Sequence, residues 1–159
     1  MTELYPWFVV THLVGLVVFA VSHGVSMFVA FRVRRIGDPA AVAALLEMSK
    51  LSVIPVYGGL LLLLVGGVGA AWGANLWFEP WILASVAVLV VVIGAMYALA
   101  TPYYVGIREA LQERGADGRP TIAAEELTRR LDTRRPEILV SVGGVGMVVL
   151  VWLMVMKPG

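Results

Sequence analysis

The chain has 159 residues, of which 60% are hydrophobic and only 14% charged, and it contains no cysteine. Soluble domains carry about 25% charged residues, so this chain has too few polar side chains to cover a water-soluble core. The lack of cysteine excludes disulfides, thiolate metal sites and iron–sulfur clusters, and a net charge of +1 gives no sign of a nucleic-acid partner.

Four long apolar segments follow one another along the chain, and none contains Asp, Glu, Lys or Arg. Each is long enough to cross a hydrocarbon core of about 30 Å as a helix, and helices satisfy their own backbone hydrogen bonds in lipid. The segments cover residues 7–31, 52–72, 81–101 and 138–156. The sequence therefore predicts an all-α, integral membrane four-helix bundle in which residues 1–159 form one domain.

Two histidines, His12 and His23, are the only ionisable side chains inside the first segment. Eleven helical steps of about 100° return to within about 20° of the same direction, so both histidines and Gly15 share one face, with the imidazoles about 16 Å apart. Ionisable residues are costly inside a membrane and are candidates for function. Imidazole is an axial ligand of haem iron, so two stacked haem b groups are one interpretation, with Gly15 leaving space beside a porphyrin.

The loop at residues 32–51 follows the first segment. Asp38 is expected to cap a short connecting helix that begins near Pro39. The second and third segments then follow, each rich in glycine or alanine, which lets helices approach closely in lipid. Counting from the membrane edges places Tyr57 and Met96 near the depth of His23.

The loop at residues 105–136 is longer. Residues 104–113 are expected to continue the third helix. Residues 114–120 contain two glycines and a proline, a composition that predicts a turn. A short helix capped by Thr121 should follow, and Pro136 suits the first turn of the last segment. The depth count places Met154 of that segment near His12.

Eleven of the twelve basic residues lie in these two loops, and Lys157 is the exception. Cytoplasmic loops are enriched in Lys and Arg, so we expect both loops in the cytoplasm and both chain ends outside, an N-out/C-out topology. No basic residue precedes the first segment, which predicts a retained helix rather than a signal peptide. The arginines at 129, 130, 134 and 135 are interpreted as topology-setting charge, with contact to anionic lipid as the alternative.

The second axial ligand of a haem is open at the level of sequence. Methionine ligates haem iron, which makes Met96 and Met154 candidates. A parallel homodimer that pairs each histidine with its copy, or a five-coordinate haem, is equally compatible. The alternatives to haem are neutral histidines hydrogen-bonded to a serine or carbonyl, or another ion or proton role.

The stretch from His12 to Phe19, with glycine three residues after histidine, resembles the first-helix signature of several bacterial membrane families. These are the membrane haem-containing protoporphyrinogen oxidase family, the copper-resistance D family and, closest in layout over the whole chain, a family of bacterial integral membrane proteins of unknown function. The oxidase resemblance implies haem at His12. That family's third-span lysine has no counterpart between Trp81 and Thr101.

Three functions are compatible with these observations. The first is a small multi-pass protein of the bacterial plasma (inner) membrane that binds haem b for electron transfer or haem handling. His12 and His23 would then be the iron ligands, with Gly15, Tyr57, Met96 and Met154 at the cofactor. The second is a non-catalytic subunit that packs in a homo-oligomer or larger membrane complex, and the third is a small transporter or channel component. Beyond the lipid bilayer, the sequence names no partner.

Overall fold

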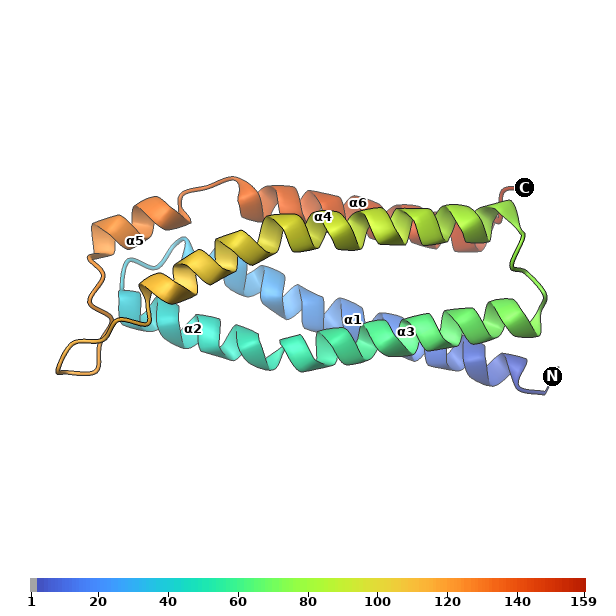
Figure 1. Ribbon diagram of the computed structural model, residues 1–159, viewed down its shortest axis with the longest axis horizontal. Helices are drawn as coiled ribbons and strands as arrows, with labels where there is room; N and C mark the ends of the chain where they lie inside the picture. The colour runs from blue at the N-terminus through green and yellow to red at the C-terminus, as the bar shows by residue number, and fades with distance from the viewer. Residues whose placement is uncertain (1–2) are drawn as a thin grey trace.

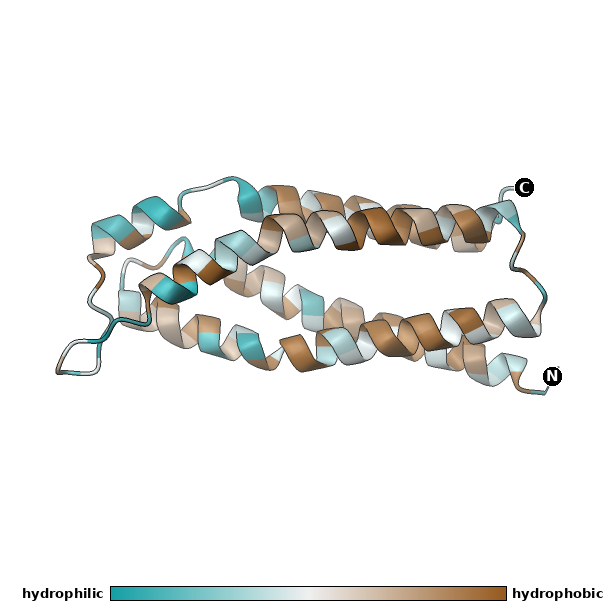
Figure 2. Ribbon diagram, viewed as in Figure 1, coloured by the Kyte–Doolittle hydropathy of each residue, from teal (hydrophilic) through white to brown (hydrophobic). Residues whose placement is uncertain are grey.

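The computed structural model describes residues 3–159, and these form six helices (Figure 1). Four are long and apolar enough to cross a membrane. They are α1 (Tyr5–Val33), α3 (Val53–Gly73), α4 (Pro80–Ala110) and α6 (Arg135–Met156). The shorter helices are α2 (Pro39–Leu51) and α5 (Ala124–Leu131). The predicted all-α fold with four membrane helices is confirmed, and Figure 2 shows the apolar residues concentrated along these four helices.

The two ends of the bundle differ in character. One end holds both termini and the short α3–α4 connection (Figure 1). The other holds α2, α5 and the turn before α5, and it is the more hydrophilic end in Figure 2. We call the first the terminal end and the second, which contains residues 32–51 and 105–136, the basic end.

The start of α2 is capped by the side chain of Asp38. The Asp38 carboxylate accepts hydrogen bonds from the backbone N–H groups of Ala40 and Ala41, at 3.2 and 3.1 Å. These contacts satisfy two donors that the first turn of a helix leaves free. The predicted cap and the helix start at Pro39 are confirmed, and only Ser52 separates α2 from α3.

The predicted cap of α5 is wrong. This helix begins at Ala124, and its cap position is Ala123, which has no capping side chain. The hydroxyl of Thr121 instead donates to the carbonyl of Glu113 at 3.2 Å, and the Thr121 backbone N–H bonds the same carbonyl at 2.9 Å. Thr121 thus closes the turn after α4, which leaves it unavailable to the helix that follows.

Helix α4 continues beyond the third apolar segment to Ala110, as predicted, with Pro102 inside it. A proline within a helix removes one backbone hydrogen bond and crowds the preceding turn, which bends the helix. Figure 1 shows the part of α4 after its middle running in a different direction from the part nearer the terminal end. The bend brings the end of α4 toward α1 and α2.

The four long helices pack as two antiparallel pairs, α1 with α3 and α4 with α6. The pairs meet most closely at the basic end (Figure 1), where α1, α2, α4 and α5 share a buried apolar cluster. That cluster contains Val29, Val33, Val42, Leu46, Tyr103, Ile107, Leu111, Leu127 and Leu131. Most apolar side chains elsewhere remain exposed, which suits helices whose outer surface meets lipid tails.

Candidate functional site

Three glycines bring the backbones of α1 and α3 into direct contact. A Cβ on Gly15 would lie 2.3 Å from the backbone nitrogen of Leu63, and one on Gly66 would lie 2.3 Å from that of His12. A Cβ on Gly59 would lie 2.5 Å from the backbone nitrogen of Phe19. No side chain fits at such distances, so all three positions serve the close approach of the two helices. The space beside Gly15 is filled by the backbone of α3.

His12 lies in this tight seam, half-buried against α3. Its Nδ1 is 2.7 Å from the carbonyl oxygen of Leu63, and its ring lies over Gly67, whose missing side chain leaves it room. A carbonyl can only accept, so Nδ1 carries the proton and donates. In the neutral ring this tautomer leaves the lone pair on Nε2, the arrangement that metal-ligating histidines commonly adopt. The same bond equally satisfies a structural histidine.

His23 has quite different neighbours. Its ring stacks on that of Phe19, with centroids 5.4 Å apart and planes 6° from parallel. An ideal Cβ on Gly143 of α6 would lie 3.6 Å from Nε2 of His23 and 3.9 Å from the sulfur of Met96 of α4. A nitrogen and a sulfur donor from opposite helix pairs therefore both lie within van der Waals contact of the position that a side chain at residue 143 would occupy.

The His23 ring makes no hydrogen bond to any of residues 3–159. His23 is half-buried, and its ring nitrogens are not among the fully buried polar atoms that lack a partner in the described residues, so they stay accessible to a ligand. His23 thus differs from His12, whose ring is tied to a carbonyl. Of the two imidazoles, His23 is the one that the fold leaves available for a ligand.

The other residues singled out from the sequence are less engaged. The Tyr57 side chain on α3 is 64% exposed, which directs it toward the surroundings of the bundle. Met154 lies half-buried on α6. Across residues 3–159, no three His, Cys, Asp or Glu side chains gather closely enough to hold a metal ion. The structure therefore brings together His23, Met96 and Gly143, and it holds His12 and Gly15 in the α1–α3 seam.

Charged side chains gather at the basic end. Arg34, just after α1, forms an ion pair with Glu137 in the first turn of α6, and this contact links the two helix pairs. The hydrogen bond to Glu137 raises the pKa of the Arg34 guanidinium above its ordinary value. On α5, Glu126 pairs with both Arg129 and Arg130, the latter at 2.8 Å.

Among known protein families, the model of the predicted integral membrane proteins called DUF2269 matches residues 7–158. The chain belongs to the DUF2269 family. No curated protein and no solved structure matches it. The family match supports the membrane assignment and covers all four long helices, the histidine-bearing α1 included.

Two features of this DUF2269 protein were missed in the sequence. Gly143 of the fourth apolar segment was not singled out, although an added Cβ there would contact both His23 and Met96. The Leu63 carbonyl, which holds His12, gave no signal at all because any residue offers a backbone carbonyl. Met96 was found from its depth, since antiparallel helices of known span place residues at matching levels.

Proposed function

We propose that this DUF2269 protein binds haem b in the membrane, with His23 and Met96 as the iron ligands. The observation that carries the proposal is the approach of the His23 Nε2 and Met96 Sδ atoms to the one position that a side chain at Gly143 would occupy. A histidine nitrogen and a methionine sulfur together are a known axial pair for haem iron, one that raises its reduction potential. Bound haem would supply one-electron redox chemistry, which suits electron transfer or haem handling.

The residues around His23 fit such a group in three respects. Its imidazole has no competing hydrogen bond within residues 3–159. The ring is held in one orientation by stacking on Phe19. Its neighbours come from both helix pairs, whose backbones make few contacts beyond the basic end. A flat group inserted between the pairs would therefore displace little packed backbone.

His12 is the second proposed ligand. Its Nδ1–H is already fixed by the Leu63 carbonyl, which orients the ring and leaves Nε2 as the coordinating atom. The resemblance of residues 12–19 to the haem-associated first-helix signature also supports His12. By the same proposal, the protein lies in the bacterial plasma membrane with both ends outside.

The test is the absorption spectrum of detergent-purified protein after addition of haem b. We expect a Soret band that is lost in His23→Ala. In Met96→Leu the haem should remain bound with a lower reduction potential, because the thioether ligand is removed. Met48→Leu is the matched control, since Met48 is an exposed methionine on α2, and it should behave as the wild type. A Soret band that survives in His23→Ala and is lost in His12→Ala would move the site to His12, and no band at all would refute the proposal.

A second candidate function is a non-catalytic subunit of a membrane complex. Gly94 on α4 and Gly144 on α6 have nothing within 4 Å of an added Cβ, and they lie at the same depth because Gly146 faces Val92 in the same antiparallel pair. Exposed glycines let a helix from another chain approach closely. A colourless protein that purifies with a stoichiometric partner, and loses it in Gly94→Leu, would favour this function over haem binding.

A further inference from the structure

A pocket of about 440 Å³ lies at the basic end, where α1, α5 and α6 meet. We call it the elbow pocket, because it occupies the bend between α5 and α6. Leu131, which is 2% exposed, forms part of its apolar wall. Its other lining residues include Phe31, Arg34, Arg35, Thr128, Asp132 and Glu137.

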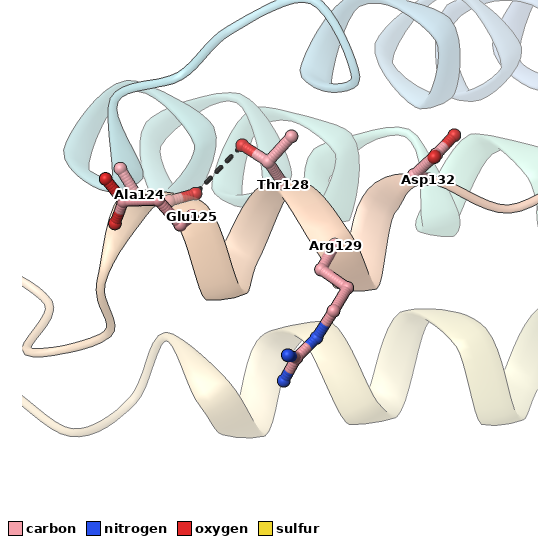
Figure 3. Close-up of a pocket in the computed structure, with 5 residues that line it drawn as sticks. All are labelled: Ala124, Glu125, Thr128, Arg129 and Asp132. Atoms are coloured by element: carbon pink, nitrogen blue, oxygen red, sulfur yellow. Dashed lines mark hydrogen bonds between the residues drawn. The ribbon is translucent and has the colours of Figure 1, made fainter.

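A second hollow lies nearby on α5, but it differs in construction. Its lining residues, Ala124 to Asp132, come from one helix and the residue after it (Figure 3). Figure 3 shows Arg129 pointing away from Asp132, so the charged groups of this hollow do not converge. The elbow pocket, in contrast, is lined by residues from the end of α1, from α5 and from the start of α6.

Of the four charged side chains that line the elbow pocket, two form an ion pair with one another and two do not. Arg34 and Glu137 neutralise one another in the ion pair that links α1 to α6. Arg35 and Asp132 are both exposed, and neither side chain forms an ion pair or hydrogen bond within residues 3–159. The pocket therefore offers one available cation and one available anion.

The depth of the elbow pocket is that of lipid headgroups. Phe31 is the last residue of the first apolar segment, and Glu137 immediately precedes the fourth, which begins at Ile138. The Phe31 side chain is 37% exposed, so apolar surface adjoins the charged groups on the membrane side. A ligand here would have a polar head among the charges and an apolar tail alongside α1.

A pair of opposite charges selects among headgroups. A phosphate is a strong acceptor for a guanidinium, which suits Arg35. A primary ammonium donates hydrogen bonds to a carboxylate, which suits Asp132. A purely anionic headgroup would leave Asp132 facing a like charge, and the methylated ammonium of choline has no N–H to donate.

We propose that the elbow pocket binds the zwitterionic headgroup of phosphatidylethanolamine, with the phosphate on Arg35 and the ammonium on Asp132. The bound lipid would span the junction between α1 and the α5–α6 bend. It would thus add to the Arg34–Glu137 contact that joins the two helix pairs. This proposal is independent of haem binding.

Native mass spectrometry of the detergent-purified protein tests the proposal. Phosphatidylethanolamine, phosphatidylglycerol and phosphatidylcholine with identical acyl chains are titrated separately. We expect phosphatidylethanolamine to be retained most strongly, and Arg35→Gln and Asp132→Asn each to weaken its retention by about threefold to fivefold, as an exposed charge contact would. Arg119→Gln and Glu109→Gln are matched controls, because both residues carry the same charges at exposed positions outside the pocket.

Several outcomes would overturn the proposal. One is equal retention of phosphatidylethanolamine and phosphatidylcholine, and another is a preference for phosphatidylglycerol that depends on Arg35 alone. Pocket variants that match their controls would do the same. Soluble phosphoethanolamine that binds as tightly as the lipid would reassign the pocket to a small phosphate compound. All four substitutions are at exposed positions, so unchanged thermal melting should show that the variants remain folded.

Discussion

At the scale of single residues, the fold uses its glycines in two different ways. Gly143 and Gly144 are neighbours on α6, yet an added side chain at Gly143 would meet His23 and Met96, while one at Gly144 would meet open space. A larger residue at 143 should therefore fill the volume proposed for a ligand. A larger residue at 144 should not.

This contrast gives a prediction about the proposed haem site. In Gly143→Leu we expect haem retention to fall by at least tenfold, because the leucine side chain occupies the space between the two donor atoms. Gly144→Leu should retain haem as the wild type does. Titration of haem b into each purified variant, followed by its Soret absorbance, makes the measurement. Equal retention by both variants would show that the ligand does not lie beside Gly143.

The histidines show how far residue-level reasoning from the sequence reaches. Helical periodicity found one shared face for His12 and His23, and the depth count found Met96. Neither periodicity nor depth could distinguish the environments of the two imidazoles, because those environments are formed by residues that are distant in the sequence. The His12 ring donates a hydrogen bond to the Leu63 carbonyl, and a backbone carbonyl cannot be recognised as a partner from the sequence. His23 meets Gly143 only through the crossing of α1 with α6.

At the scale of elements, the α1–α3 pair depends on backbone contact. Glycines of the second segment were expected to allow close packing, and Gly59 and Gly66 do so. Gly15 was instead interpreted as leaving space beside a porphyrin, although the backbone of α3 fills that space. Composition identifies a glycine face, but it does not say whether a helix or a ligand lies against it.

We predict that Gly66→Ala separates α1 from α3. The new Cβ would lie 2.3 Å from the backbone nitrogen of His12, so the backbones must move, at a cost of about 1–3 kcal/mol. Gly58→Ala is the matched control, because it adds the same methyl group on the same helix with nothing within 4 Å. Thermal unfolding in detergent should show a lower midpoint for Gly66→Ala alone. If both variants melt together, the close approach of the two helices does not stabilise the protein.

At the scale of the whole molecule, four apolar segments sufficed to predict the helices, since a backbone in lipid must satisfy its own hydrogen bonds and uncharged segments of about 20 residues have the length of membrane-spanning helices. The partition into two pairs was not predictable, because every long helix is apolar on most sides and periodicity gives no inward face. The basic end joins the pairs through side chains from α1, α2, α4 and α5. Those contacts are long-range, and the loop sequences alone do not reveal them.

The charge asymmetry of the two ends predicts the orientation of the protein in the membrane. Both termini lie at the end opposite the two arginine-rich loops (Figure 1), and lysine and arginine are retained on the cytoplasmic side. We therefore predict that Phe78, 91% exposed in the α3–α4 connection, faces out of the cell, and that Gln112 after α4 faces the cytoplasm. Because the chain has no cysteine, Phe78→Cys and Gln112→Cys each create a single labelling site. In intact cells a membrane-impermeant maleimide should label the first variant only, and lysis should expose the second. The reverse pattern would invert the topology, and it would place the elbow pocket in the outer leaflet without altering its charges.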